Sequence, residues 1–408
     1  MTLSELATLD KLDNLGKLDN LGNAAIIATE QAHTSGVYPK RDVALVRGLG
    51  AQVWDADGVE YLDCTSAQGA ANLGHCHPAV VAALHEQAQI LISCPEIFPN
   101  DQRAAYQQAL VAALPNGMAR VFLCNSGAEA IEGALKFARL LTGRTGIVAT
   151  KRGFHGRTMG ALSTTWEPKY REPFAPLLAD VTHVAYNNLD ELDRAVHATT
   201  AAVLIELVQG EGGVRPADPA YVQGVAALCR ERGALLIVDE VQTGFGRTGR
   251  LWACDHYGIT PDLITLAKSI AGGVPMGAIG IHARFGTLQP ATHGTTFGGN
   301  PFGCAVARAV LHELTTTDLL CQAALKGEYL LGKLRALTSP KIREVRGMGL
   351  IVGIELKERV QPYLIRLLEE QRVLALPAGP TVLRLLPPLV IEYAQLDRAV
   401  AAVAEVLA

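Results

Sequence analysis

The sequence lacks the features that would assign it to several common classes of protein. It contains no run of the roughly 18 continuous apolar residues that a membrane-spanning helix needs. Its N-terminus has no basic start followed by an apolar stretch, so no signal peptide is predicted. Basic residues are not in excess, since the formal net charge is −4. We therefore expect neither a nucleic-acid partner nor a membrane.

Paired cysteines are also missing from the sequence. The eight cysteines are scattered and include no Cys-x-x-Cys, which is typical of reduced thiols in the cytoplasm and not of a disulfide framework or a zinc ribbon. The stretch GHCHP (74–78) places metal-binding side chains close together. Neighbours this close rarely complete a tetrahedral site alone, and no second cluster follows. We expect a cytoplasmic protein without a metal site.

What the sequence does contain is a large apolar core. A hydrophobic fraction of 49% over 408 residues is enough for two domains. From about residue 120 to 281, short apolar runs alternate with helical stretches that end in glycine. Such continuous apolar runs indicate parallel strands buried on both faces, and hence an α/β domain with a mostly parallel central sheet. The predicted strands are 120–124, 146–150, 202–207, 234–240 and 262–267, and the predicted helices include 128–143 and 219–233.

The two ends of the chain differ from this central part. Residues 41–65 are typical of a small antiparallel meander, and strand-like segments return after Cys304. We expect both ends to pack together as a smaller α+β domain. The expected divisions are a mobile N-terminal arm with a duplicated KLDNLG (1–23), a large domain (76–304), and the two parts of the smaller domain (24–75 and 305–408).

Lys268 is the only charged side chain between Asp262 and His282. A lysine in such a stretch either extends to the surface or lies in a pocket. In a pocket, desolvation disfavours the charged amine and lowers its pKa, which makes the amine a nucleophile able to form a Schiff base. For a single lysine the surface position is the more common outcome. The residues at the other strand ends are therefore needed to choose between the surface and a pocket.

The other predicted strands of the central domain also end in chemically useful residues. The turn Ser126-Gly127-Ala128 opens a helix, where free backbone N–H groups and the helix dipole favour a phosphate. Asp239 ends a buried strand, where a carboxylate needs a cationic partner. The further candidates are an aromatic face (Phe154), a carboxylate-binding fork (Arg157), a glutamate between glycines (Glu211), an amide (Gln242) and two small donors (Thr295 and Thr296).

Together these side chains supply what pyridoxal 5′-phosphate requires. That cofactor needs an anchor for its phosphate, a lysine for a Schiff base and an acid opposite its pyridine nitrogen. Asp239 would keep the nitrogen protonated, and Lys268 would move a proton at the substrate carbon. Because such residues follow successive strands, coincidence is a poor explanation, and the sequence predicts a pyridoxal-phosphate enzyme.

Three segments closely resemble the class III aminotransferases, which have fold type I of the pyridoxal-phosphate enzymes. They are DEVQTGFGRTG (239–249), PDLITLAKSIAGGVPMGA (261–278) and HGTTFGGNP (293–301), and the similarity extends from about Thr34 to the C-terminus. The resemblance implies a homodimer. It also implies roles in cofactor binding for Lys268 (covalent attachment), Asp239 (pyridine nitrogen), Gln242 (ring hydroxyl), Phe154 (stacking), Val241, Ser126, Gly127 and Ala128 (phosphate), and Thr296 (phosphate, from the partner subunit).

The resemblance also implies how substrates are bound. Arg157 would bind the α-carboxylate of the substrate, with Thr295 nearby. Glu211 would mask Arg384 while a semialdehyde substrate is bound, and release it for the α-carboxylate of glutamate or 2-oxoglutarate. A departure from the family is Leu207, where a proline usually follows the glutamate, and we expect no change in the chemistry.

Within the family, TSGVY (34–38) and KIREVRGMGLIVGIELKE (341–358) look most like members of lysine biosynthesis. Tyr38 matches a substrate-contact tyrosine. Those members use glutamate to aminate the semialdehyde of 2-aminoadipate, which is attached to LysW, a small acidic carrier protein, and they give carrier-bound lysine. An acidic carrier should meet a basic rim around the cleft. The candidates for this rim are Lys40, Arg41, Lys169 and Arg171.

Other functions explain fewer residues. An acetylornithine or ornithine aminotransferase of arginine metabolism is the nearest alternative, because only the outer pocket would differ. A class III mutase would have no use for the Glu211–Arg384 pair. A nicotinamide-dependent oxidoreductase would need Gly-x-Gly-x-x-Gly after its first strand, and GFGRTG (244–249) lacks that spacing and context. A non-catalytic binding protein would not need an acid and a lysine in one pocket.

Overall fold

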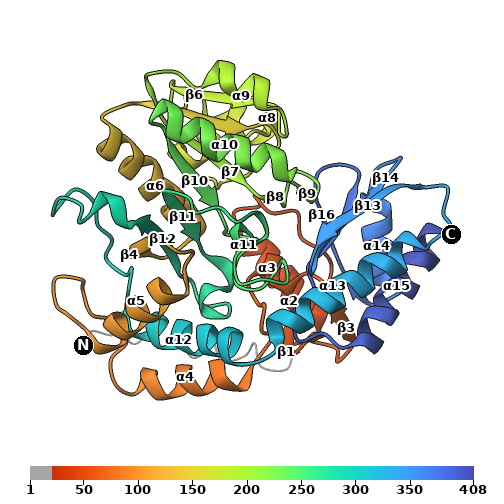
Figure 1. The fold of residues 1–408 in the computed structure, drawn as a ribbon. Coiled ribbons are helices and arrows are strands. Elements are labelled where there is room, and N and C mark those ends of the chain that lie inside the picture. Colours follow the sequence, from red (N-terminus) through yellow and green to blue (C-terminus); the bar gives the residue numbers. More distant parts are fainter. Residues whose placement is uncertain (1–20) are drawn as a thin grey trace.

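A seven-stranded sheet forms the centre of the computed structural model, which describes residues 21–408 (Figure 1). Its strand order is β4-β12-β11-β10-β7-β5-β6. Neighbouring strands pair in parallel, except that β12 is antiparallel to both β4 and β11. The strands are β4 (Met118–Cys124), β5 (Gly146–Thr150), β6 (Val181–Val184), β7 (Thr200–Glu206), β10 (Leu235–Asp239), β11 (Leu263–Leu266) and β12 (Gly277–His282).

Helices cover both faces of this sheet. Along β10, Ile237 packs with the residues of α6 on one face, and Val238 packs with those of α10 on the other. Burial on both faces explains why the strands are uninterrupted apolar runs. The helices around the sheet are α4 (Pro78–Ala88), α5 (Asp101–Ala113), α6 (Gly127–Thr142), α7 (Met159–Thr164), α8 (Pro168–Arg171), α9 (Leu189–Ala195), α10 (Pro219–Arg232), α11 (Cys254–Tyr257) and α12 (Pro301–Thr316).

The expected strands and helices of this domain are all present, with ends within two residues of the prediction. Two strands of the central sheet, β6 and β12, were not predicted, and neither was the small sheet of β8 (Val208–Gln209) and β9 (Arg215–Pro216). Glycines hide β12 from a search for apolar runs, and the packing explains them. A Cβ on Gly277 would lie 2.5 Å from the carbonyl oxygen of Ser126, and one on Gly280 would lie 2.6 Å from Ile264. Glycine in a strand marks such a close approach.

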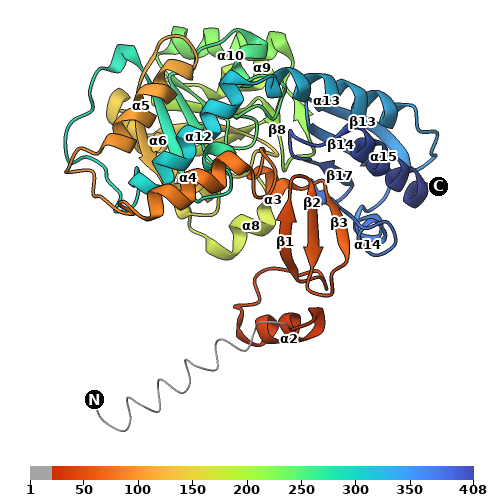
Figure 2. The ribbon, with the colours of Figure 1, turned by 90° about the horizontal axis from the view of Figure 1, so that it is seen from below.

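The two ends of the chain form smaller sheets beside the central one (Figure 2). The predicted meander is present as antiparallel strands, and a strand from the C-terminal region, β15, pairs in parallel with β3. The α+β part built from both ends is therefore confirmed, while the residues at which the domains begin stay predictions. Its elements are α2 (Asn23–His33), β1 (Leu45–Leu49), β2 (Gln52–Asp55), β3 (Glu60–Asp63), α3 (Ser66–Gly69), α13 (Leu319–Arg335), β13 (Ile342–Met348), β14 (Ile351–Leu356), α14 (Gln361–Glu369), β15 (Val373–Leu374), β16 (Leu376–Pro377), β17 (Val382–Leu385) and α15 (Tyr393–Leu407).

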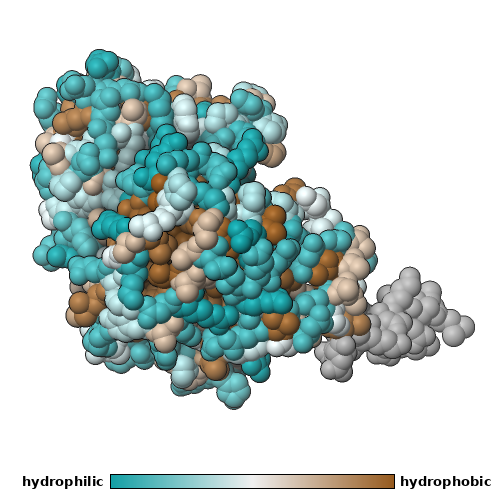
Figure 3. Space-filling model, turned by 90° about the vertical axis from the view of Figure 1, so that its right-hand side faces the viewer, coloured by the Kyte–Doolittle hydropathy of each residue, from teal (hydrophilic) through white to brown (hydrophobic). Residues whose placement is uncertain are grey.

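The predicted N-terminal arm falls almost entirely outside the described residues, as does most of the KLDNLG duplication. Among residues 21–408, no helix combines the length and the apolar character needed to cross a membrane. The face seen from the side of the smaller sheets is mostly hydrophilic, with hydrophobic side chains gathered in a hollow (Figure 3).

Candidate active site

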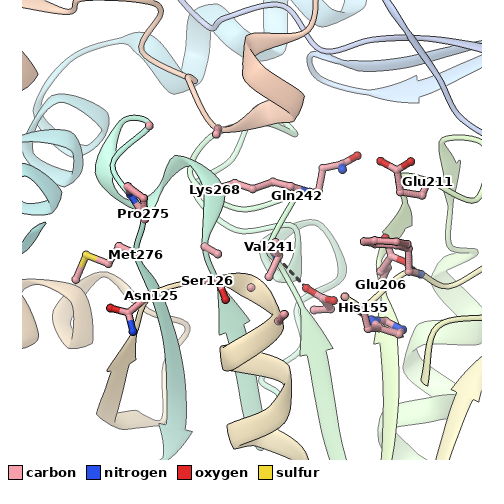
Figure 4. A pocket seen from close by; sticks show the side chains of 18 of the residues that line it. Asn125, Ser126, His155, Glu206, Glu211, Val241, Gln242, Lys268, Pro275 and Met276 are labelled. Atoms are coloured by element: carbon pink, nitrogen blue, oxygen red, sulfur yellow. Dashed lines mark hydrogen bonds and ion pairs between the residues drawn. The ribbon is translucent and has the colours of Figure 1, made fainter. Parts of the chain in front are cut away.

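A pocket of about 310 Å³ lies at the carboxyl ends of the central strands (Figure 4). This is the edge at which ligands bind in open α/β sheets. Segments that follow β4, β5, β7, β10 and β11 line it, so the residues predicted from separate strand ends come together in space. The predicted residues that line the pocket are Ser126, Gly127, Ala128, Phe154, Glu211, Asp239, Val241, Gln242 and Lys268.

Lys268 lies just beyond the end of β11, where it begins a single 3₁₀ turn. Its φ of 48° is left-handed, a conformation that side chains other than glycine seldom adopt. The next residue holds this turn in place, because the Ser269 hydroxyl donates to the carbonyl of Gly69 at 2.7 Å. Desolvation in the pocket lowers the pKa of Lys268 below its ordinary value, although the negative charge of Glu211 opposes that shift. The amine therefore meets the electrostatic condition for a nucleophile.

Asp239 lies at the end of β10, lines the pocket and is 5% exposed. One carboxylate oxygen accepts hydrogen bonds from the Val241 N–H at 3.0 Å and the Thr265 hydroxyl at 3.2 Å. The other contacts Nδ1 of His155 at 2.8 Å. The carboxylate is thus fixed in orientation by three groups, which suits it to face a cationic ring nitrogen.

Two titratable side chains in the pocket lining, His155 and Glu206, were not predicted from the sequence. They lie side by side at one end of the pocket, away from Asn125 and Met276 at the other (Figure 4). A signal for Glu206 was present, because it ends β7 as Asp239 ends β10, and the two residues are paired across these strands. Burial raises the pKa of Glu206 to about 7, and Asp239 adds to the shift while His155 opposes it.

The start of α6 also lies in the pocket lining. The Ser126 side chain caps the helix by accepting from the N–H of Glu129 at 3.1 Å. Within residues 21–408, the backbone N–H groups of Gly127 and Ala128 have no acceptor. A Cβ on Gly127 would lie 2.9 Å from a methyl carbon of Val241, so the glycine keeps this corner open. Free N–H groups at a helix start match a phosphate.

Glu211 and Arg384 form an ion pair of 2.5 Å beside Lys268. Arg384 comes from β17 of the small domain and is 2% exposed, and its Nη1 also donates to the side-chain oxygen of Gln242 at 3.1 Å. Burial would raise the pKa of Glu211, but Arg384 and Lys268 outweigh it and lower the pKa below its usual value. Glu211 is therefore charged at neutral pH and holds the guanidinium.

The remaining predicted residues lie outside the pocket lining. Thr295 adjoins it, because its hydroxyl accepts from Asn125 Nδ2 at 3.0 Å. The Arg157 guanidinium lies 3.5 Å from the ring centre of Tyr170, which in turn meets Phe154 edge to face. Thr296 and Tyr38 are exposed side chains. Their roles, like those of the pocket residues, stay predictions.

The GHCHP segment has a structural explanation. His75 contacts the buried carboxylate of Asp63 through Nε2 at 2.7 Å, and its backbone forms a bridge to Gly50. In the described part of the chain, no three His, Cys, Asp or Glu side chains are grouped so that they could hold a metal ion.

Comparison with known proteins defines the class first. The pattern of the family described as "Aminotransferase class-III" matches residues 35–407. The chain therefore belongs to the class III aminotransferases.

Individual relatives show which members of this family the chain resembles. The chain is 53% identical over 384 residues to the [LysW]-aminoadipate semialdehyde transaminase of Deinococcus radiodurans, covering 93% of this chain and 90% of that one. It is 41% identical to the acetylornithine aminotransferase of Methanosarcina acetivorans, covering 92% and 94%. Among solved structures, the ornithine aminotransferase of Toxoplasma gondii superimposes with a TM-score of 0.93 at 33% identity, covering 98% and 97%. That structure is described as showing partial occupancy of pyridoxal phosphate at its active site.

Proposed function

We propose that this protein transfers an amino group between glutamate and the terminal semialdehyde of 2-aminoadipate bound to the carrier LysW, giving carrier-bound lysine. The observation that carries the proposal is the Glu211–Arg384 pair beside Lys268, because it lets one pocket serve a neutral aldehyde end and a carboxylate in turn. The 53% identity to a [LysW]-aminoadipate semialdehyde transaminase supports this choice of substrate.

The residues of the pocket fit pyridoxal phosphate. Gly127 and Ala128 offer unpaired N–H groups for its phosphate, Asp239 offers a fixed carboxylate for its ring nitrogen, and Lys268 offers an amine with a lowered pKa. When bound, the cofactor supplies an electron sink for the bond broken at the substrate carbon. Gln242 and Phe154 lie within the same lining and would contact the ring.

Two side chains would then divide the proton chemistry. Lys268 would take the proton from the substrate carbon, because desolvation lowers its pKa and so favours the neutral, basic amine. Asp239 would face the ring nitrogen in a fixed orientation, since Val241, Thr265 and His155 hold both carboxylate oxygens.

The ion pair would act as a substrate switch. With Glu211 in place, Arg384 has no free charge for an anion, and a substrate that ends in an aldehyde or an amine is accepted. Glutamate instead brings its α-carboxylate to this position, which would displace Glu211 and pair with the guanidinium. Glu211 is the more exposed partner, with 32% of its side chain accessible against 2% for Arg384, so it is the group that moves.

Two of the four predicted rim residues are bound to other groups of this chain. Lys40 is engaged with Glu30 at 2.5 Å, and Arg41 donates to the carbonyl of Ala375 at 2.7 Å. Lys169 and Arg171 instead lie on α8, whose Tyr170 stacks on Arg157 and touches Phe154 of the pocket. We therefore place the docking surface for an acidic carrier at α8.

A comparison of amino donors tests the proposal. The reaction is run towards glutamate with 2-oxoglutarate as acceptor, and kcat/KM is measured for carrier-linked lysine and for free N-acetylornithine. We expect a strong preference for the carrier-linked donor. In the double variant Lys169→Glu/Arg171→Glu, we expect KM for that donor to rise roughly tenfold, because an attractive surface becomes repulsive, while N-acetylornithine is unaffected.

The matched control is Arg194→Glu/Arg230→Glu, which makes the same change of charge at exposed sites on α9 and α10. It should leave both donors unaffected. Equal or better turnover of N-acetylornithine by the unaltered protein would assign it to arginine synthesis instead, the alternative that the 41% identity to an acetylornithine aminotransferase favours.

We also propose a homodimer, in which Thr296 completes the phosphate site of the partner. Exposed apolar side chains lie near this threonine. Arg103 donates to the carbonyls of Cys94 and Phe98 and to that of Gly299, and so holds the segment 94–98 next to the segment 296–299. A soluble monomer rarely exposes such a patch. The exposed members of the patch are Ile90, Ile92, Ile97, Phe98 and Phe297.

The dimer predicts a loss of cofactor when the patch is made polar. In Ile97→Asp/Phe98→Asp we expect sedimentation as a monomer and a weaker hold on pyridoxal phosphate, since each site would lack the partner's threonine. The variant Ile365→Asp, at an exposed isoleucine of α14, should do neither. A patch variant that stays dimeric, or an unaltered protein that sediments as a monomer, would contradict the proposal.

A further inference from the structure

We propose that Glu206 is a positioning residue, which fixes the aromatic wall of the pocket and the switch glutamate relative to each other. Its Oε1 accepts from the N–H of Phe154 at 2.9 Å, and its Oε2 accepts from the N–H of Gly210 at 3.1 Å. Gly210 directly precedes Glu211. One carboxylate thus ties the loop that carries the stacking residue to the turn that carries the switch.

Glu206 is well placed to be an anchor. It ends β7, a strand whose seven residues are all buried, and is itself 5% exposed. Its backbone carbonyl accepts from the Tyr186 hydroxyl at 2.8 Å. A side chain on a rigid central strand can hold loops to within the tolerance that a reacting geometry needs.

The turn at Gly210 transmits this position to two other pocket residues. A Cβ on Gly210 would lie 2.0 Å from Oε1 of Gln242, so the backbone there is packed directly against that amide. The same amide oxygen accepts from Arg384, which pairs with Glu211. A shift of Gly210 therefore moves Glu211 and disturbs the group that Arg384 contacts.

The tie depends on charge. An ionised carboxylate accepts a hydrogen bond at each of its two oxygens. A protonated one carries a hydrogen on one oxygen, which competes with the N–H that this oxygen would accept from. Desolvation raises the pKa of Glu206 to about 7, with Asp239 adding to the shift and His155 opposing it. The other titratable groups that face it are Lys268 beyond β11 and Tyr186 beyond β6. Protonation as the pH falls through neutrality would therefore release one of the two backbone contacts.

The test is Glu206→Gln, which keeps the size of the side chain but turns one acceptor into a donor. We expect kcat/KM for the carrier-linked amine to fall roughly 10- to 100-fold, as for a hydrogen bond to a charged group. The value for glutamate should fall less, because glutamate binds when Glu211 is displaced. In the unaltered protein we expect an inflection in kcat/KM for the carrier-linked amine near neutral pH, where Glu206 titrates. In Glu206→Gln that inflection should vanish, and the circular dichroism of the bound cofactor should change. Glu206→Asp, which keeps the charge and both acceptor oxygens, should retain the inflection.

The matched control is Glu240→Gln. Glu240 is fully buried, follows β10 and accepts from the Cys254 N–H at 2.8 Å and the Thr243 hydroxyl at 2.5 Å, but does not line the pocket. The Glu240→Gln variant should lose stability but keep the pH inflection and the ratio of kcat/KM between the two substrates. If both variants behave alike, Glu206 is merely structural and the inference is overturned.

The inference rests on the proposed function, yet the two fail differently. An unaltered protein that transfers no amino group would overturn the function. A protein that transfers amino groups and whose Glu206→Gln variant matches it in substrate ratio and pH profile would overturn only the positioning role.

Discussion

Replacing Lys268 with alanine is expected to reduce turnover by about 10²- to 10⁴-fold, the range contributed by a positioned acid–base group. The pocket holds no second amine that lines it within the described residues, so no neighbour replaces the lost base. The measurement is a single turnover with glutamate, followed through the absorbance of the cofactor. A small exogenous amine should restore part of the rate in the alanine variant, because the cavity left by the side chain is open to the pocket.

A second buried lysine provides the control for this experiment. Lys326 is 8% exposed, donates to the carbonyl of Leu389 at 3.1 Å and also has a pKa lowered by burial, but lies outside the pocket. Lys326→Ala should lose stability and keep its turnover per bound cofactor. If Lys268→Ala turned over as fast as Lys326→Ala, the assignment of the catalytic base would be wrong.

Arg384→Ala is expected to separate the two half-reactions. For glutamate, kcat/KM should fall by the equivalent of about 2–5 kcal/mol, the cost of removing one partner of a buried charge pair, because its α-carboxylate no longer pairs with a guanidinium. The amine substrate should be affected much less, since it is bound while Arg384 is masked by Glu211. Rapid-reaction kinetics of each half-reaction measure the two values separately.

Two further variants sharpen this result. Glu211→Gln removes the mask and should improve glutamate relative to the amine, the opposite direction from Arg384→Ala. Arg346→Ala removes another buried arginine, which pairs with Glu355 at 2.6 Å outside the pocket, and should leave the ratio between the substrates unaffected. A uniform loss for both substrates in Arg384→Ala would show that the arginine is structural and not a switch.

Much of this site could be predicted from the sequence because chemistry and topology coincide there. Lys268 and Asp239 each follow an apolar strand, and parallel strands that end at one edge bring such residues together. The fold class followed from the same alternation of strands and helices. The pairing of Glu211 with Arg384 depended on the family resemblance, because no local pattern links positions so far apart.

The residues that were missed act through contacts that no local pattern encodes. His155 meets Asp239 across 84 positions of the chain, and Glu206 meets Phe154 across 52. The stacking of Arg157 on Tyr170 likewise depends on how α8 packs against the segment that follows β5. Strand β12 was missed for a different reason. Its glycines are needed because neighbouring atoms leave no room for a side chain, and they interrupt the apolar run by which a strand is predicted.

The pairing of β15 with β3 also sets an order of events during synthesis. Strand β3 ends at Asp63, but its parallel neighbour Val373–Leu374 leaves the ribosome roughly 310 residues later, a delay of about 15–60 s at ordinary rates of translation. All strands of the central sheet are complete by His282. The large domain can therefore collapse first, while the N-terminal meander waits with one edge unpaired, open to chaperones or to aberrant strand addition.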